Sequence, residues 1–273
     1  MTTWPELVAA ATEQIGAGDV RHIARECAGT VELIAARPTG MQRARFEQLV
    51  ARRAAGEPLQ YVLGRWGFRT VDLMVDPRVL IPRPETEVVA GLAIEATRRR
   101  RGARIVDLGT GSGAIALAVA AELDDPGLEV WGVDVSADAI AVAQANLAGL
   151  GRAGGRVRLV EGDWFGGLER ALAGRIDVVV ANPPYIGAAE ELPPEVADWE
   201  PAAALVAGPT GREALEAIVA AAPDWLAGDG VLVLETAPDQ APGVAALARR
   251  VGFARAVVHP DLTGRLRAVV AER

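Results

Sequence analysis

Short apolar runs alternate with amphipathic stretches between residues 104 and 235. The runs end in polar or glycine residues, a pattern typical of the buried strands of a parallel sheet. The stretches between them repeat apolar residues at helical spacing. Strict alternation of strands and helices predicts an α/β fold with a doubly wound, mostly parallel sheet. The expected strands are 104–108, 129–133, 157–161, 176–181 and 231–235, and the expected helices are 114–122, 137–147 and 211–226.

The end of the chain departs from this alternation. Two β-like segments, 254–259 and 266–270, are joined by the short stretch 260–264, which contains proline and glycine. Such a short connection predicts an antiparallel hairpin rather than a helical crossover. A terminal hairpin on a parallel sheet is unusual for a dinucleotide-binding fold.

The first part of the chain is expected to be helical. Trp4, Leu7 and Ala11 recur at helical spacing, and Phe46 and Leu49 repeat the pattern. The turns between helices are expected at Gly16–Asp19 and Arg37–Gly40. The segment that follows has β-like alternation and then several prolines. We therefore expect three parts, which are a small helical domain over 1–64, a β-like linker or hairpin over 65–84, and the α/β domain over 85–273.

The charge balance limits the partners that the chain can bind. The formal net charge is −8, and every basic residue is arginine. Binding along a phosphate backbone requires clustered positive charge, which this chain lacks apart from Arg98–Arg101. That run is typical of the last turn of a helix, where cations oppose the macrodipole. We expect no direct nucleic-acid partner.

The cysteines, the histidines and the apolar runs of the chain disfavour a disulfide, a metal site and a membrane span. Cys27 is the only cysteine, so neither an internal disulfide nor a thiolate metal cluster is expected. His22 and His259 lack metal-ligand spacing, and we expect no metal site. No apolar run is long enough to span a bilayer, and the N-terminus does not resemble a signal peptide. We expect a cytoplasmic protein with no membrane partner.

The most informative run is Asn182-Pro183-Pro184-Tyr185, directly after the strand expected at 176–181. The carboxyl ends of parallel strands form the ligand-binding edge of an open α/β sheet. Two consecutive prolines stiffen the loop and aim its carbonyls. A flat polar group there would meet the Asn182 amide, the Pro183 carbonyl and the Tyr185 ring, which suits a planar nitrogen bearing N–H groups. The alternative is a turn that merely ends the strand.

A glycine-rich loop follows the first strand of the alternating region. Gly109, Gly111 and Gly113 lie where the backbone must turn sharply close to a ligand. Asp134 ends the next strand, about where an acid that binds ribose hydroxyls is expected. Together they predict a nucleoside-containing cofactor. On this loop alone NAD and S-adenosylmethionine remain equally open, and a tight turn without a ligand is a third interpretation.

A further cofactor signal follows the third strand. Asp163, Trp164 and Phe165 lie just beyond its end. An acid followed by an aromatic residue can hydrogen-bond an adenine amino group and cover the face of the base. We expect this role for Asp163 and Trp164, whereas we expect Phe165 to lie in the core.

Taken together, these motifs resemble those of the class I S-adenosylmethionine-dependent methyltransferases that act on planar nitrogens. The motifs are Gly109–Gly113, Asp134, Asp163-Trp164 and Asn182–Tyr185. Within these, the chain resembles the protein-glutamine N5-methyltransferases that modify peptide chain release factors (the PrmC/HemK family). The closer match is carried by Pro58–Gly64, Leu80–Glu87, Glu200-Pro201 and Ala204–Gly208. The resemblance covers nearly the whole chain. It implies a class I methyltransferase fold with a seven-stranded sheet, with residues 85–273 as the methyltransferase domain.

The resemblance also implies roles for individual residues. The family's substrate is the glutamine of a Gly-Gly-Gln tripeptide in class 1 release factors. Asn182, Pro183, Pro184 and Tyr185 would bind that glutamine, with Asn182, Pro183 and Tyr185 as the catalytic residues. The family usually has a glycine soon after the Glu of the fifth strand, and Thr236-Ala237-Pro238 follow Glu235 here, so we assign that loop no role. The implied S-adenosylmethionine site consists of Gly109, Thr110, Gly111, Ser112, Gly113, Asp134, Asp163, Trp164 and Asn182.

Three other functions compete with this interpretation. An adenine-N6 nucleic-acid methyltransferase uses the same tetrapeptide on a flipped base, but the acidic balance and the lack of a separate basic domain disfavour it. An NAD-dependent enzyme is disfavoured by the tetrapeptide and the terminal hairpin. A non-catalytic binding protein is disfavoured by the intact cofactor loop. We expect a monomeric enzyme whose partners are class 1 release factors.

Overall fold

The computed structural model describes residues 3–29 and 37–273, and these fall into two compact units. The smaller unit comprises 1–65 together with 193–199, and the larger comprises 66–192 and 200–273. The sequence pattern did not indicate that 193–199 would group with the N-terminal helices.

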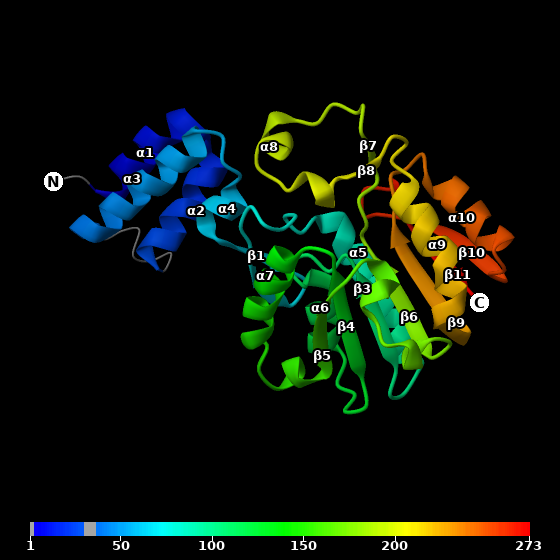
Figure 1. Cartoon of the computed structure of the whole chain (residues 1–273). Helices are drawn as coiled ribbons and strands as arrows, with labels where there is room; N and C mark the ends of the chain where they lie inside the picture. The colour runs from blue at the N-terminus through cyan, green and yellow to red at the C-terminus, as the bar shows by residue number, and fades with distance from the viewer. Residues whose placement is uncertain (1–2, 30–36) are drawn as a thin grey trace. The chain divides into compact units, whose positions relative to one another are not determined.

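Helices form the smaller unit (Figure 1). Its core contains Trp4 and Phe46, whose rings meet edge to face with centroids 5.6 Å apart. The turn expected at Gly16–Asp19 is confined to Gly16, because the second helix already begins at Ala17. Arg53 joins the segment 193–199 to this unit by donating from Nη2 to Glu195 Oε1 (3.1 Å). The helices are α1 (Trp4–Ile15), α2 (Ala17–Ala28), α3 (Gly40–Ala54), α4 (Leu59–Leu63) and α8 (Pro194–Ala197).

A seven-stranded sheet forms the middle of the larger unit, in the order β10-β11-β9-β6-β3-β4-β5. Neighbours among β5, β4, β3, β6 and β9 are parallel, and β11 is antiparallel to both β9 and β10. The predicted doubly wound sheet with a C-terminal hairpin is therefore confirmed. The strands are β3 (Arg104–Leu108), β4 (Glu129–Asp134), β5 (Val157–Glu161), β6 (Ile176–Ala181), β9 (Leu226–Glu235), β10 (Arg255–Pro260) and β11 (Leu266–Glu272).

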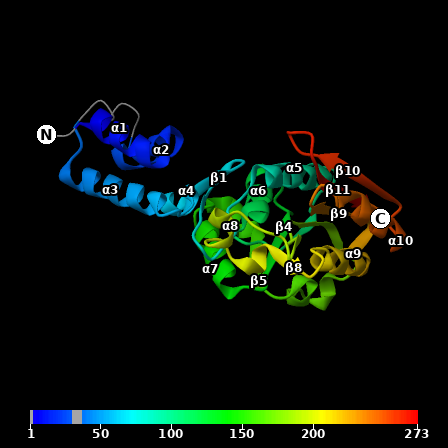
Figure 2. The same ribbon diagram turned by 90° about the horizontal axis from the view of Figure 1, so that it is seen from above.

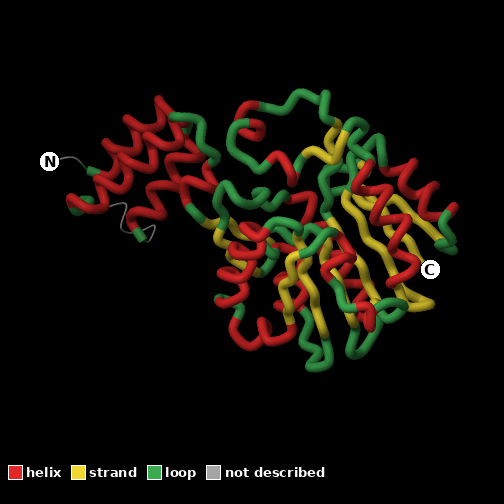
Figure 3. The backbone as a smooth tube through the Cα atoms, viewed as in Figure 1, coloured by secondary structure: helices red, strands yellow, loops and turns green. Residues whose placement is uncertain are grey.

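Helices cover both faces of this sheet, with α5 and α6 on the opposite side from α9 and α10 (Figures 2 and 3). Ser136 begins α7 as expected, because its Oγ accepts a hydrogen bond from Ala139 N (3.2 Å). Pro84 opens α5 at a position where a missing N–H costs nothing. The helices are α5 (Pro84–Arg98), α6 (Ala114–Glu122), α7 (Ala137–Ala148), α9 (Glu213–Trp225) and α10 (Ala241–Arg250).

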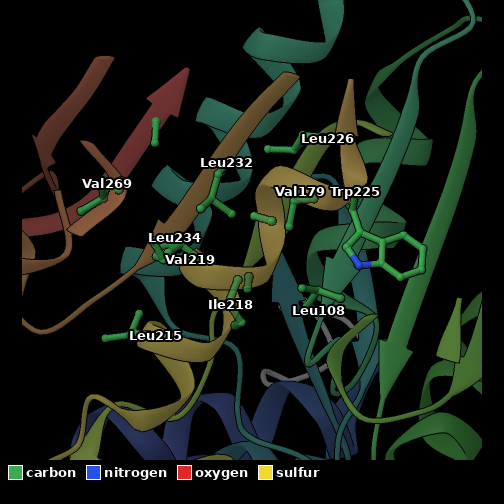
Figure 4. Packing of buried hydrophobic residues seen from close by; sticks show 14 of the residues in the cluster. Leu108, Val179, Leu215, Ile218, Val219, Trp225, Leu226, Leu232, Leu234 and Val269 are labelled. Atoms are coloured by element: carbon green, nitrogen blue, oxygen red, sulfur yellow. The ribbon is translucent and has the colours of Figure 1, made fainter. Parts of the chain in front are cut away.

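A buried hydrophobic core of the larger unit lies between the sheet and α9 (Figure 4), and α10 also contributes to it. Leu108 and Val179 from the sheet pack with Ile218 and Val219 of α9, and all four are fully buried. Burying such side chains stabilises the fold by about 1.5–3 kcal/mol each. This packing makes the carboxyl ends of β3, β6 and β9 a rigid platform for the loops that follow them.

Shorter elements complete the larger unit. β1 (Arg65–Phe68) pairs with β2 (Val71–Met74), and β7 (Ile186–Gly187) pairs in parallel with β8 (Val206–Gly208). The first pair lies within the segment expected to be β-like. Short 3-10 helices span Gly151–Arg156, Trp164–Gly167, Arg170–Leu172 and Ala202–Ala204. Among residues 3–29 and 37–273, no helix has the length and apolarity needed to cross a bilayer.

Candidate active site

Strand register brings three functional segments together. Leu108 of β3 pairs with Ala181 of β6, and Ala181 pairs with Leu234 of β9. The next residues along these three parallel strands are Gly109, Asn182 and Glu235. Asn182 therefore lies between the glycine loop on one side and Glu235 on the other, although these residues are far apart in the sequence.

A cavity opens at this edge of the sheet. Seven of the residues expected in the site line it, and these come from the carboxyl ends of β3, β4, β5 and β6 or from the loops after them: Gly109, Gly111, Asp134, Asp163, Trp164, Asn182 and Pro184. Residues 78–80 together with Pro201, Ala203 and Ala204 supply another part of the lining. Thr110, Ser112, Gly113, Pro183 and Tyr185 are not among the lining residues. Thr110, Ser112, Gly113 and Pro183 are buried behind the surface, and Tyr185 is half-buried.

The glycine loop has a backbone that requires glycine. Gly109, Gly111 and Gly113 have φ values of 72°, 55° and 85°, which residues with a Cβ rarely adopt. A Cβ on Gly111 would meet no atom within 4 Å, so this glycine faces open space. A Cβ on Gly109 would lie 3.6 Å from the Trp164 ring and 3.9 Å from the Asn182 carbonyl oxygen. The loop can thus bring its backbone close to a ligand.

Asp134 holds this loop in place. Its carboxylate accepts hydrogen bonds from Gly111 N (2.8 Å) and Ser136 N (2.9 Å). Burial raises the pKa of Asp134, and the backbone N–H groups that it accepts from oppose that shift. The same carboxylate lines the cavity, so its remaining lone pairs can accept hydrogen bonds from a ligand there.

Thr110 supports the loop from beneath. Its Oγ1 donates to Asp107 Oδ2 (2.7 Å), and the same oxygen accepts from Ala116 N (3.1 Å). Burial raises the pKa of Asp107 to about 7. A Cβ on Gly132 would lie 2.8 Å from Thr110 Oγ1, which shows how closely β4 passes under the loop.

Apolar side chains form another part of the cavity. Trp164 lines it with a φ of 46°, a conformation that is strained for a bulky residue and tends to occur at functional sites. Val135 also lines it and is 65% exposed, although it is a large apolar residue. Phe165 is buried and stacks on Trp225 with centroids 5.4 Å apart, which confirms that it belongs to the core.

Hydrogen bonds connect the tetrapeptide to three residues to which the sequence alone gave no role: Thr86, Glu235 and Gln240. Asn182 Nδ2 donates to Thr86 Oγ1 (3.1 Å), and Thr86 Oγ1 donates to Glu235 Oε2 (2.7 Å). Tyr185 Oη donates to Glu235 Oε1 (3.2 Å). Gln240 Nε2 fixes the tetrapeptide backbone by donating to the Tyr185 carbonyl (2.9 Å). The sequence signal for this network was Glu235, an acidic residue directly after the apolar run Val231–Leu234.

Two of the runs that carry the family resemblance, Leu80–Glu87 and Glu200-Pro201, meet beside the cavity. Glu200 is buried, accepts from Ile81 N (3.1 Å) and forms an ion pair with Arg83. This connection holds the segment before α5 against the segment that begins at Pro201. Both segments supply residues that line the cavity. The two runs therefore help to form the cavity wall, a role that their sequence did not reveal.

Burial dominates the electrostatics of the site. It raises the pKa of Glu235 to about 7 and raises that of Tyr185 further above its usual value. Within the described residues, no group of three or more His, Cys, Asp or Glu side chains is placed to bind a metal ion.

Comparisons with known proteins add independent information. Residues 88–196 match the family model of the methyltransferase small domain, and residues 31–64 match that of the PrmC N-terminal domain. The chain is 44% identical over 232 residues to the release factor glutamine methyltransferase of Moorella thermoacetica, covering 84% of this chain and 80% of that protein. It is 38% identical over 275 residues to the release factor glutamine methyltransferase of Xylella fastidiosa (strain Temecula1), covering 97% and 96%.

A solved structure supports the fold alone. The methyltransferase from Pyrococcus furiosus superposes with a TM-score of 0.53 at 18% identity, covering 86% of this chain and 98% of that one. At this identity the likeness carries no information about substrate.

Proposed function

The chain belongs to the release factor glutamine methyltransferase family, and from this premise we propose that it methylates the glutamine of the Gly-Gly-Gln motif in class 1 peptide chain release factors. It is an S-adenosylmethionine-dependent protein-glutamine N5-methyltransferase. The observation that carries the proposed site is the position of Asn182, which lines the cavity and is hydrogen-bonded to the buried network behind it. We also propose residues 85–273 as the catalytic domain, 65–84 as a linker and 1–64 as a separate helical domain.

The cavity suits the methyl donor of this family, S-adenosylmethionine. Gly111 offers open backbone, Asp134 offers carboxylate oxygens for ribose hydroxyls, and Val135 and Trp164 offer apolar surface for a base. Thr110, Ser112 and Gly113 would act by shaping the loop, and Asp163 would meet the polar edge of the base. When bound, the cofactor supplies an electrophilic methyl group on a sulfonium.

The chain's own residues would orient the nucleophile. An amide nitrogen is a poor nucleophile because its lone pair is delocalised into the carbonyl. Asn182 Oδ1 and the Pro183 carbonyl would accept its two N–H groups and stabilise the positive charge that develops on nitrogen. Pro184 would keep the loop stiff, and the Tyr185 ring would cover the plane of the amide. Good alignment of this kind lowers barriers by roughly 7–11 kcal/mol in the best intramolecular cases.

Mass spectrometry of the product tests this function. The enzyme would be incubated with S-adenosylmethionine and a class 1 release factor, beside a release factor whose Gly-Gly-Gln glutamine is replaced by alanine. We expect one added methyl on that glutamine and none on the alanine variant. A methyl at another residue would refute the proposal, as would transfer to adenine in a DNA or RNA substrate tested in parallel.

A further inference from the structure

We propose that Thr86 and Glu235 are positioning residues that fix which way the Asn182 carboxamide faces, so that its oxygen meets the substrate amide. This inference rests on the proposed function, and it assigns a role to two buried residues behind the same site. Neither residue touches the reacting atoms, and both act through Asn182.

The three residues form one hydrogen-bonded relay. Thr86 lies in the first turn of α5, Asn182 directly follows β6, and Glu235 ends β9. Asn182 Nδ2 donates to Thr86 Oγ1 (3.1 Å), which donates to Glu235 Oε2 (2.7 Å). Thr86 is 4% exposed and Glu235 is 1% exposed, so water cannot readily replace either partner.

The ionised carboxylate sets the direction of the relay. A carboxylate only accepts hydrogen bonds, so the Thr86 hydroxyl must give its single proton to Glu235. The Thr86 oxygen is then an acceptor, and the group of Asn182 that faces it must be the NH2. Because the carboxamide is planar, Oδ1 points to the other side.

The opposite orientation of the Asn182 carboxamide would be unfavourable at both its oxygen and its NH2 group. Its oxygen would face the Thr86 oxygen with no proton between them, unless the hydroxyl turned away and left Glu235 without that partner. Its NH2 would then meet the N–H groups of the incoming glutamine amide. A buried polar atom without a partner costs about 1–3 kcal/mol. Shape alone does not distinguish the two ends of a carboxamide, so the relay supplies the distinction.

The same carboxylate also fixes Tyr185, whose hydroxyl donates to Glu235 Oε1 (3.2 Å). One buried group thus positions two residues of the tetrapeptide. The charged groups facing Glu235 are Arg267 from β11, which favours its ionised form, and Glu85 from α5, which opposes it.

Protonation of Glu235 would weaken this relay. Burial raises the pKa of Glu235 to about 7. The protonated carboxyl carries a donor of its own, which competes with the protons of Thr86 and Tyr185. We therefore expect kcat to rise with pH through about 7 as the carboxylate forms.

Substitutions at Thr86 test the relay. Thr86→Val keeps the side-chain shape and removes the hydroxyl, and we expect kcat to fall on the order of 10²-fold, the loss typical of a misaligned reacting group. The dissociation constant of S-adenosylmethionine and the KM for release factor should change little. Thr86→Ser restores the hydroxyl and should recover most of the lost kcat. Thr97→Val is the matched control, because Thr97 is a buried threonine of the same helix whose hydroxyl donates within that helix, to Ala93 O (2.7 Å).

Glu235→Gln provides a second test that does not depend on the fold of the Thr86 variants. The glutamine NH2 can donate to Thr86, which then donates to Asn182 and reverses its carboxamide. We expect a lower kcat and loss of the rise in kcat near pH 7. Wild-type kcat in Thr86→Val, no recovery in Thr86→Ser, or an unchanged pH profile in Glu235→Gln would each overturn the inference. Failure of the wild-type enzyme to methylate release factor would instead refute the proposed function, and the positioning role with it.

Discussion

Replacing Asn182 by alanine removes the acceptor on which the proposed mechanism depends. The side chain is half-buried, and its amide makes the hydrogen bond to Thr86 Oγ1 at 3.1 Å. Losing that bond should lower the free energy of unfolding by only about 0.5–1.5 kcal/mol. The rate should suffer more, because Asn182 Oδ1 is one of two acceptors for the substrate amide. By analogy with the loss of one oxyanion-hole donor, we expect a barrier higher by about 2.7–4 kcal/mol, or a kcat lower by about 10²–10³-fold.

Three measurements separate these effects for Asn182→Ala. Methyl transfer to a class 1 release factor gives kcat and KM, calorimetry gives the dissociation constant of S-adenosylmethionine, and urea denaturation gives stability. Because Asn182 also lines the cavity, some loss of cofactor affinity is expected, but the loss in kcat should be much larger. A kcat close to that of the wild type, with cofactor binding intact, would refute the reasoning. A variant that failed only because it unfolded would show this in the urea curve.

Three further predictions concern the loop and its supports. Gly132→Ala places a Cβ 2.7 Å from Leu159 Cδ2 and 2.8 Å from Thr110 Oγ1. We expect urea denaturation to show a free energy of unfolding lower by about 1–3 kcal/mol. Gly228→Ala is the control, because its Cβ meets no atom within 4 Å, and it should show no such loss. Asp134→Ala leaves two backbone N–H groups without their acceptor and should weaken cofactor binding in calorimetry, so an unchanged dissociation constant would remove Asp134 from the site. Asp107 has a folded pKa raised to about 7, so its contribution to stability is present below about pH 4 and is lost as the pH rises toward 7. Asp107→Asn should flatten that dependence, and denaturation curves that keep the wild-type slope over this range would contradict the assignment.

Much of the larger unit follows from local sequence. Apolar runs and the spacing between them predicted β3 to β6 within a residue or two. β3, β4 and β6 lie inside the sheet and are largely buried, so their sequences are mostly apolar. Ser136 marked the start of α7 because its side chain satisfies a backbone N–H of the first turn. The terminal hairpin was predictable from the short connection between its strands.

Local rules failed where a boundary depends on packing. α9 ends at Trp225 and β9 starts at Leu226, five residues before the strand expected from the apolar run that begins at Val231. The extension pairs with Ile176 of β6, a contact between segments distant in sequence. Gly16 alone makes the turn between α1 and α2 for a similar reason, because packing of the two helices sets where the second begins.

The sequence by itself determined the kind of chemistry, since the glycine loop, Asp134 and the tetrapeptide after β6 each carry a recognisable residue pattern. Only the tertiary structure decided how that chemistry is supported. Thr86, Asn182 and Glu235 have no relation in spacing, and they meet because parallel strand register places Asn182 beside Glu235 while α5 packs across β6 and β9. Local propensity fixes the course of a segment, whereas the partner of a buried polar group depends on which segments the core brings together.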